Sequence, residues 1–249
     1  MTTRKVQNPN AKGGAGFIWA LLAIVVIAAV VIGLVFFNGR TQRNEAIAEK
    51  MIAVDNLTVS YNEGDPYLVL AGAEAAEGTP SVDLFEDFSC SHCADLAKAT
   101  DGEMLDKIQA GDLTVNLHPM TFLDGQGAQY KQGHSTRALA AELALAANND
   151  VKALWNLRAT LFENQQGLYN KLDNNGFADQ ARDFGASEQA VNDIREGKYV
   201  SAAEEMGKAN LDYQNEKTGE AYTPRVMRDD KDLEVPGGDI KQWLEAATS

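Results

Sequence analysis

The sequence predicts an α/β domain that carries a helical insertion and follows a single membrane-spanning helix. A strand pattern at 82–88, a helix pattern at 90–110 and a strand pattern at 113–117 form a strand–helix–strand unit, which implies a parallel strand pair. Helical periodicity then runs from 129 to about 213, and strand patterns return after it. An uncharged stretch of 21 residues, 17–37, precedes all of these elements.

The apolar stretch predicts a membrane anchor. It contains no charge and no proline, and as a helix it would measure roughly 30 Å, the thickness of the hydrocarbon core of a bilayer. A cleaved signal peptide is the alternative, because Ala46-Ile47-Ala48 has a suitable small-residue pattern. That site lies far beyond an apolar stretch that is already long for a signal peptide. We therefore expect a cytoplasmic tail at 1–16, an uncleaved transmembrane anchor at 17–37 and a stalk at 38–55.

The charge of the chain excludes one class of partner. Residues 38–249 carry 19 Lys and Arg against 36 Asp and Glu, a net charge of −17. Nucleic-acid binding needs clustered Lys and Arg to contact phosphates, so we expect no nucleic-acid partner. The acidity is consistent with solubility.

The α/β domain opens with two short strand patterns, at 57–61 and 67–70, joined by a turn that contains Gly and Pro. The strand–helix–strand unit follows, and its second strand is expected to stop at His118-Pro119.

The insertion at 129–213 repeats apolar residues at helical spacing, and we expect three to five helices within it. A strand pattern returns at 222–228. Asp239 is a good N-cap for a last helix that has one apolar face. The core of the domain therefore combines residues 56–128 with residues 214–249.

The two cysteines of the chain, Cys90 and Cys93, lie at the strand-to-helix turn, a position typical of a redox-active Cys-x-x-Cys. Cys90 is expected at the helix N-terminus, where free N–H groups and the helix dipole favour the reactive thiolate. His92 can offer a further N–H or a positive charge. Both effects lower the thiol pKa, and a stabilised thiolate makes the disulfide a strong oxidant. Cys93, one turn deeper, would resolve a mixed disulfide by attacking Cys90.

Two structural interpretations of the cysteines compete with this one. A zinc site could use Cys90, Cys93, His118 and His134, but structural zinc sites usually add a second pair of ligands at short spacing. A purely structural disulfide would close a tiny loop and would contribute little stability. We expect His118 to be a surface or packing residue and His134 to be a solvent-exposed residue in the first turn of a helix.

The side of the membrane on which the C-terminal domain lies is predicted from the cysteine chemistry, because the charges that flank the apolar stretch do not decide it. Three basic residues flank the apolar stretch on each side, which leaves its orientation undecided. A lone cysteine pair that does oxidative work belongs outside the reducing cytosol. We therefore expect a single-pass membrane protein whose C-terminal domain is extracytoplasmic.

A second candidate for the site is Thr223-Pro224, which opens the first strand pattern after the insertion. Proline at the start of a strand is by itself a weak signal. At this position it could pack against the cysteine pair, and a cis bond would expose the backbone of Thr223 to an extended peptide.

These residues resemble the DsbA-like branch of the thioredoxin superfamily. The motif at 85–93 is similar to that family's strand-to-helix signature, the strand before Pro119 to its next strand, and Thr223-Pro224 to its cis-proline loop. The resemblance covers about residues 55–249, and the insertion lies where the family places its helical domain. The predicted anchor makes the chain similar to membrane-tethered versions in Gram-positive actinobacteria.

The resemblance implies a thioredoxin-like fold and a protein disulfide oxidoreductase that passes its disulfide to unfolded secreted proteins. Cys90 would be the nucleophile, Cys93 the resolving thiol and His92 the thiolate stabiliser. Thr223 and cis-Pro224 would bind substrate. No cofactor or metal is implied beyond the redox-active disulfide. A membrane partner would reoxidise the pair, and we expect a monomer.

The motif residues that flank the cysteines are Asp87, Phe88 and Ser91. Two positions depart from the family pattern. Family members often have Pro after the first cysteine, where this chain has Ser91. Many keep a buried acid six residues before that cysteine, where this chain has Leu84, with Asp83 and Glu86 nearby.

Two other functions stay open at this point. A reductase or isomerase could use the same fold, although no dimerisation module is visible for an isomerase and one anchor helix cannot by itself supply electrons to a reductase. A tethered binding protein could use the helical insertion and leave the cysteine pair inert. Alkylation of the reduced protein at mildly acidic pH separates an inert pair from a reactive one.

Overall fold

The structure is a computed structural model that describes residues 19, 21–22, 24–27 and 51–249. The chain divides into two compact units, 1–50 and 51–249, and the fold described below is that of the second unit. The predicted tail, and most of the predicted anchor and stalk, lie outside the described residues. Among the residues that are described, no helix combines the length and the apolar character needed to cross a membrane.

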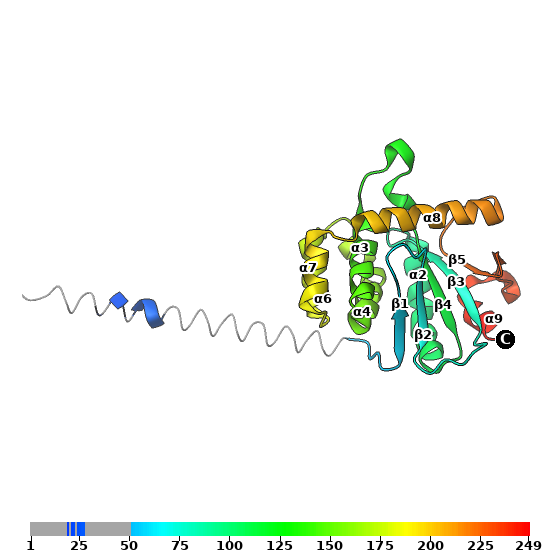
Figure 1. Cartoon of the computed structure of the whole chain (residues 1–249), viewed down its shortest axis with the longest axis horizontal. Helices are drawn as coiled ribbons and strands as arrows, with labels where there is room; N and C mark the ends of the chain where they lie inside the picture. Colours follow the sequence, from blue (N-terminus) through cyan, green and yellow to red (C-terminus); the bar gives the residue numbers. More distant parts are fainter. Residues whose placement is uncertain (1–18, 20, 23, 28–50) are drawn as a thin grey trace, which may run out of the picture. The chain divides into compact units, whose positions relative to one another are not determined.

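One sheet forms the centre of unit 51–249 (Figure 1). Its strands in chain order are β1 (Leu57–Ser60), β2 (Leu68–Gly72), β3 (Ser81–Glu86), β4 (Thr114–Pro119), β5 (Arg225–Arg228) and β6 (Lys231–Asp232). Their order in space is β1-β2-β4-β3-β5-β6. Strands β3 and β4 are parallel, and the other neighbours are antiparallel. The parallel pair predicted from the strand–helix–strand pattern is therefore confirmed.

Of the strand ends that differ from the predictions, two lie next to the cysteine motif. Strand β4 continues through His118 and Pro119, where the sequence predicted a stop, because Pro119 pairs with Glu86 as the last residue of the strand. Strand β3 ends at Glu86 rather than at Phe88. The backbone N–H of Cys90 donates to the carbonyl of Asp87, and this turn separates the strand from the next helix.

Helix α2 (Ser91–Gln109) connects the two parallel strands. The predicted cap Asp239 caps a 3-10 turn, η4 (Ile240–Gln242), and the last helix, α9 (Trp243–Ala247), begins after that turn with Gln242 as its N-cap. Between β4 and β5, unit 51–249 contains α3 (His134–Ala147), α4 (Val151–Glu163), α5 (Gln165–Leu168), α6 (Asn174–Asp183), α7 (Glu188–Glu196) and α8 (Val200–Thr218). The prediction of three to five helices misses one because α5 is a single turn, too short to show periodicity. Helix α8 also runs past the predicted border at 213.

The two faces of the central strands have different partners, because side chains alternate along a strand. Leu84 and Leu117 pair in register and belong to the main apolar core, together with the buried face of α2. Phe85 and His118 are one residue further along and point to the opposite face. There the His118 ring lies 2.9 Å from the side-chain oxygen of Asn210 on α8. The face toward α2 is the one beneath the cysteine pair.

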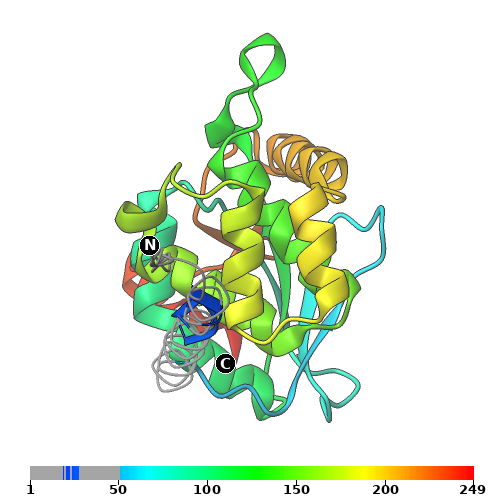
Figure 2. The same cartoon turned by 90° about the vertical axis from the view of Figure 1, so that its left-hand side faces the viewer.

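Residues 121–133 form a loop that projects beside α8, and we call it the projecting loop (Figure 2). It contains the 3-10 turns η1 (Phe122–Asp124) and η2 (Gly127–Gln129). Gly125 has a φ of +101°, a conformation that side chains disfavour. The carboxylate of Asp124 accepts hydrogen bonds from the backbone N–H groups of Gly133, Ser135 and Thr136. This carboxylate therefore joins the loop to the start of α3.

The last residues of the predicted stalk bind to the domain. The backbone of Ile52 exchanges two hydrogen bonds, of 2.8 and 3.1 Å, with the side chain of Asn156 on α4. The backbone N–H of Asp55 donates to Gln109 at the end of α2. The folded unit therefore begins before residue 56, where the sequence placed its border.

Candidate active site

The cysteine pair lies where β3 leads into α2. Cys90 is the N-cap residue of the helix, with extended backbone, and Cys93 is in its first turn. Both are free thiols in this structure. The side chain of Cys93 is only 3 % exposed, whereas Cys90 is half-buried. One sulfur is therefore open to a substrate and the other is shielded behind it, which is the arrangement that the sequence predicted.

The surroundings of Cys90 lower the pKa of its thiol to about 5. The largest cause is the hydrogen bond from the Cys93 thiol. Burial opposes it, while the side chain of Thr223 and the backbone N–H groups of Cys93 and His92 act in the lowering direction. At neutral pH, Cys90 is therefore mainly a thiolate, the form that attacks disulfides and leaves from them.

Cys93 has the opposite chemistry. Burial raises its pKa well above the usual value, and the hydrogen bond to Cys90 and the charge on that sulfur raise it further. The backbone N–H of Asp87 donates to the Cys93 sulfur at 3.5 Å, which opposes this rise. The two sulfurs therefore differ in protonation: Cys90 is the stabilised thiolate and Cys93 is the protonated thiol.

The peptide bond between Thr223 and Pro224 is cis, as predicted. The Cys90 thiol donates a hydrogen bond of 3.4 Å to the carbonyl oxygen of Thr223. Tyr222, the residue before, is 42 % exposed. The segment that leads into β5 therefore presents the backbone of Thr223 to the reactive sulfur.

A buried charged group lies behind Cys93. Arg158 from α4 donates to both carboxylate oxygens of Glu86, at 2.8 and 2.6 Å, and to the carboxylate of Asp101 on α2. Cys93 and Pro224 line the same small cavity as these three residues. Its volume of about 10 Å³ is on the scale of a single water molecule. Of the two acids noted near position 84, Glu86 is therefore the one on the side of Cys93. Its neighbour Asp83 points to the other face and bonds His118.

A further carboxyl, Glu142 on α3, is buried without a hydrogen-bond partner for either oxygen. Burial raises its pKa to about 8, and the charge of Glu86 adds to that effect while Arg158 opposes it. Glu142 is therefore protonated at neutral pH, and the charged group consists of Glu86, Asp101 and Arg158. No pattern in the sequence pointed to Glu142 or Arg158, because the contacts that define them join distant segments.

Asp87 connects the motif to the insertion. Its carboxylate accepts from the backbone of Ser89 at 2.8 Å, from the hydroxyl of Ser135 on α3 at 2.6 Å and from the backbone of Leu123 at 3.3 Å. Burial raises its pKa to about 7 against these hydrogen bonds. Asp87 therefore holds the turn before Cys90 against both α3 and the projecting loop.

The remaining motif residues differ in their surroundings. Phe88 is buried and its ring stacks on Phe162 of α4, with centroids 4.9 Å apart, whereas Ser91 is exposed. The side-chain amide of Gln165 on α5 donates to the carbonyls of Phe88 and Cys90, at 2.9 and 3.0 Å. Sequence reasoning missed Gln165, since a single glutamine in a short helix carries no recognisable signal.

The three histidines occupy different environments. The His92 side chain is exposed, and the hydrogen bond it brings to Cys90 comes from its backbone N–H. His118 is a packing residue, stacked on Phe85 with ring centroids 4.4 Å apart. The prediction of an exposed His134 is wrong, because Tyr169 and Phe177 cover its ring and leave it fully buried. Burial lowers the pKa of His134, so its imidazole is neutral.

The alternative zinc set does not come together in this fold. His118 lies on the sheet face opposite to that of Glu86 and Cys93, where it bonds Asn210 and Asp83. Within the part of the chain that the structure describes, no three His, Cys, Asp or Glu side chains are grouped so as to hold a metal ion.

Comparison with known proteins adds to this geometry. A family model described as thioredoxin matches residues 65–245. The structure is similar to that of MdbA, a thiol-disulfide oxidoreductase from Corynebacterium diphtheriae, at 37 % identity and a TM-score of 0.73 over 81 % of this chain and 98 % of that one. It is also similar to that of MdbA, a thiol-disulfide oxidoreductase from Corynebacterium matruchotii, at 28 % identity and a TM-score of 0.72 over 82 % of this chain and 98 % of that one.

Two more distant similarities were found: one is a likeness of fold at low sequence identity, and the other covers only part of the chain. DsbA from Mycobacterium tuberculosis shares 19 % identity with a TM-score of 0.52, covering 73 % of this chain and 86 % of that one, which shows a common fold. Among curated sequences, serine/threonine-protein kinase PknE of Mycobacterium tuberculosis is 26 % identical over 140 residues, or 55 % of this chain. The chain spans about a quarter of the length of the curated relatives it matches.

Proposed function

The chain belongs to the thioredoxin family, and from this premise we propose that it is a DsbA-like thiol–disulfide oxidoreductase that donates a Cys90–Cys93 disulfide to secreted proteins. One observation carries the proposal: the pKa of the half-buried Cys90 thiol is lowered to about 5, while that of the buried Cys93 thiol is raised. A disulfide whose outer sulfur leaves as a stable thiolate is a good electrophile and therefore an oxidant.

The reaction has two exchange steps. A substrate thiolate attacks the Cys90 sulfur of the oxidised pair, which forms a mixed disulfide and releases Cys93 as a thiolate. Cys93 then takes up a proton, as its raised pKa favours. A second substrate thiolate attacks the substrate sulfur of the mixed disulfide and releases the Cys90 thiolate. The substrate dithiol has lost two electrons and two protons. The pair holds both electrons and one proton, as the Cys93 thiol and the Cys90 thiolate, and the second proton passes to water.

The neighbours of the pair support each step. The backbone N–H groups of His92 and Cys93 stabilise the Cys90 thiolate when it leaves. The carbonyl of Thr223 lies 3.4 Å from the same sulfur. In the mixed disulfide this carbonyl can accept a backbone hydrogen bond from an extended substrate, the recognition mode of strand addition.

The compartment and the partners are part of the proposal. The uncharged stretch at 17–37 would anchor the chain in the cell membrane with the domain outside, because oxidative cysteine chemistry needs a non-reducing compartment. Unfolded secreted proteins would be the substrates, and a membrane partner would remove the electrons from the reduced pair.

Two other functions make different predictions. A reductase of the same fold would have a Cys90–Cys93 disulfide that stabilises the folded protein relative to the dithiol form. A tethered binding protein would have cysteines that do not react with substrate proteins. The low pKa of Cys90 favours the oxidase over both alternatives.

Trapping of substrates in cells tests the proposal. In a Cys93→Ser variant the resolving thiol is missing, so mixed disulfides between Cys90 and secreted proteins should accumulate and appear on non-reducing gels. In the matched Cys90→Ser variant they should vanish. Equal trapping by both variants, or none by either, would reject the assignment of Cys90 as the attacking residue.

A further inference from the structure

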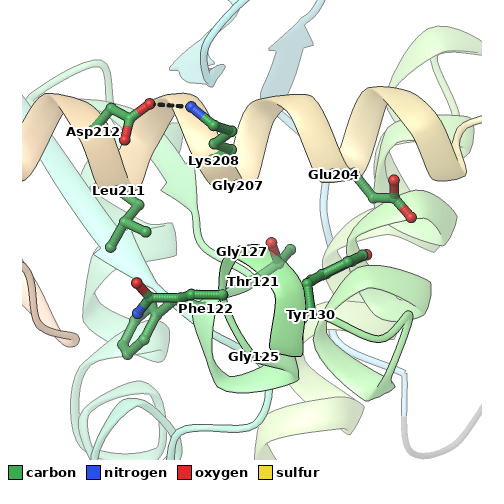
Figure 3. A pocket seen from close by; sticks show the side chains of 11 residues that line it. Thr121, Phe122, Gly125, Gly127, Tyr130, Glu204, Gly207, Lys208, Leu211 and Asp212 are labelled. Atoms are coloured by element: carbon green, nitrogen blue, oxygen red, sulfur yellow. Dashed lines mark hydrogen bonds and ion pairs between the residues drawn. The ribbon is translucent and has the colours of Figure 1, made fainter.

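Helix α8 lines two pockets, one on each of its flanks. The first has a volume of about 410 Å³ and lies between the helix and the projecting loop (Figure 3). Lys208 and Asp212 of the helix form an ion pair at this pocket, so the Asp212 carboxylate already has a cationic partner within the chain. The second has a volume of about 300 Å³ and lies between the helix and the sheet.

The second pocket, which we call the sheet–helix pocket, is separate from the redox site. Asp83 of β3 and His118 of β4 line it from the sheet, and Asn210 and Tyr213 line it from α8. Tyr67, the residue before β2, lines it as well. Asp83 and His118 lie on the sheet face opposite to that of α2 and the cysteine pair. A pocket of this volume is at the lower end of the range for small-molecule sites.

Asp83 brings a negative charge into the sheet–helix pocket, and its side chain is 18 % exposed. Burial raises the pKa of Asp83, but hydrogen bonds from His118 and Asn116 outweigh burial and lower the pKa below its ordinary value. Both hydrogen bonds go to Oδ1, at 2.9 Å from the Asn116 amide and 3.3 Å from the His118 ring. Among the residues that the structure describes, no donor is hydrogen-bonded to Oδ2. One oxygen of an ionised carboxylate is therefore open to a ligand.

Aromatic rings form the walls beside this carboxylate. Tyr67 and Tyr213 are half-buried, and their ring centroids lie 4.6 and 5.9 Å from that of His118. The face of a tyrosine ring attracts a cation through its quadrupole. None of the described residues that line the pocket is a Lys or an Arg. The pocket therefore combines a carboxylate with aromatic walls and lacks a Lys or Arg side chain of its own.

The chain itself shows which chemical group fits this combination. On the same Tyr213 ring, Nζ of Lys217 lies 5.6 Å from the ring centroid and 2.8 Å from the carboxylate of Asp230. The Tyr213 hydroxyl donates to that carboxylate. A tyrosine ring and a carboxylate thus hold an ammonium group beside the sheet–helix pocket, and within the pocket Asp83 and Tyr67 repeat the pair without the ammonium group.

We propose that the sheet–helix pocket binds an alkylammonium group, which donates to Oδ2 of Asp83 while its methylene chain lies against Tyr67 and Tyr213. A lysine side chain of a partner polypeptide and a free amine both carry this group. Further charge favours it, because Glu205 lies one helical turn before the lining residue Ala209, and the domain is acidic. The inference does not rest on the proposed function, since the pocket and the cysteines lie on opposite sheet faces.

Binding of small probes to the full chain, measured by ligand-observed NMR titration at neutral pH, tests the pocket. The first probe is Nα-acetyl-lysine methylamide, and the second is its norleucine counterpart, which lacks the ammonium group. We expect the lysine probe to bind about tenfold more tightly, because only it makes a charge-assisted hydrogen bond. Equal binding of the two probes, or binding of neither, would overturn the proposal.

A third probe, n-butylammonium, distinguishes the two sources of the group. It carries the end of a lysine side chain without a peptide backbone. If it binds as tightly as the lysine probe, the pocket is a site for free amines. If the lysine probe binds more tightly, the pocket recognises the side chain of a polypeptide.

Variants locate the binding. Asp83→Asn keeps the shape of the side chain and an oxygen that accepts the bonds from Asn116 and His118, so the fold should be retained while the lysine probe binds about tenfold more weakly. Asp212→Asn is the matched control, because it removes an equal charge from the opposite flank of the same helix, and it should change the affinity little. Tyr67→Leu keeps an apolar side chain but removes the aromatic face, so the affinity should again fall.

The comparison of the two Asp variants decides the location of the site. A loss of affinity in Asp83→Asn no larger than that in Asp212→Asn would overturn the assignment to this pocket, since both remove one negative charge from the domain. Thermal melts of each variant report whether it folds. Should Asp83→Asn not fold, Tyr67→Leu takes its place, and an unchanged affinity in that variant would equally overturn the assignment.

Discussion

The Cys90 thiol donates a hydrogen bond of 3.4 Å to the carbonyl oxygen of Thr223, a residue 133 positions away. This contact joins the start of α2 to the segment that leads into β5. Only the protonated sulfur can make it, whereas the Cys93 thiol and the backbone N–H groups of His92 and Cys93 stabilise the thiolate. Together with the side chain of Thr223, these thiolate contacts outweigh the burial that opposes them and lower the pKa of Cys90 to about 5.

The first prediction concerns the reactivity of Cys90. Iodoacetamide should label the reduced protein at Cys90 with a rate that rises through a midpoint near pH 5, because the thiolate is the reactive species. Cys93 should stay unlabelled below its raised pKa. Peptide mass spectrometry after short reaction times measures both. A midpoint at the ordinary thiol value would contradict the stabilised thiolate.

A matched pair of variants identifies the source of that low midpoint. His92→Ala removes the exposed imidazole but keeps the backbone N–H that contacts the sulfur, so the midpoint should change little. Cys93→Ser substitutes the residue whose thiol is the largest cause of the lowered pKa, so the midpoint should move upward, since a hydroxyl fits the contact less closely. A larger effect of His92→Ala would assign the stabilisation to the imidazole.

The second prediction is that the dithiol protein is more stable than the disulfide protein. The folded pKa of Cys90, about 5, lies below the ordinary thiol value of 9.0. The thiolate therefore adds stability that is fully present above pH 9 and is lost as the pH falls toward 5. The disulfide closes only a small loop, so it lowers the entropy of the unfolded chain little and adds little stability to the oxidised form. Denaturant melts of both redox forms at several pH values measure the difference, and a more stable disulfide form at neutral pH would indicate a reductase.

The third prediction concerns the unpartnered carboxyl of Glu142. Its pKa is raised from 4.5 to about 8, so the folded state binds a proton that the unfolded state releases. Stability therefore falls as the pH rises between these values, by about 1.4 kcal/mol for each pH unit at most. Glu142→Gln removes this titration and breaks no hydrogen bond, because neither carboxyl oxygen has a partner.

Urea melts of Glu142→Gln and wild type at a series of pH values check this directly. The variant should equal the wild type below about pH 4.5 and exceed it by a few kcal/mol near pH 8. Glu188→Gln is the control, since Glu188 is an exposed carboxylate on α7 and should show no such trend. A variant less stable than wild type at pH 8 would mean that Glu142 is ionised in the folded protein.

The fourth prediction concerns Arg158, which is buried between Glu86 and Asp101. Arg158→Met leaves both carboxylates without their partner, and breaking a buried ion pair in this way costs about 3–5 kcal/mol. Arg182→Met removes two exposed ion pairs, with Asp179 and Glu188, and should cost less than about 1 kcal/mol. Urea melts at neutral pH measure both. A loss for Arg158→Met as small as that for Arg182→Met would show that the carboxylates take up protons instead.

Much of the architecture could be predicted because it rests on local patterns. The parallel pairing of β3 and β4 followed from a strand–helix–strand order that closes in one way. The role division between Cys90 and Cys93 followed from their places at a helix start, one N-cap and one a turn deeper. Predictions failed where the surroundings of a residue are set by residues far away in the sequence. His134 is polar and opens a helix, yet Tyr169 and Phe177 cover it.

The sequence by itself determined the redox motif, the order of the elements and the uncharged stretch at 17–37, because each depends on residues that are neighbours in the chain. Only the tertiary structure decided that Glu86, rather than Asp83, faces Cys93, since strand alternation and the turn after β3 set the direction of each side chain. It alone paired Glu86 with Arg158, 72 positions later, and formed the pocket between the projecting loop and α8. Burial and long-range packing create these features, and the spacing of neighbouring residues in the sequence predicts neither of them.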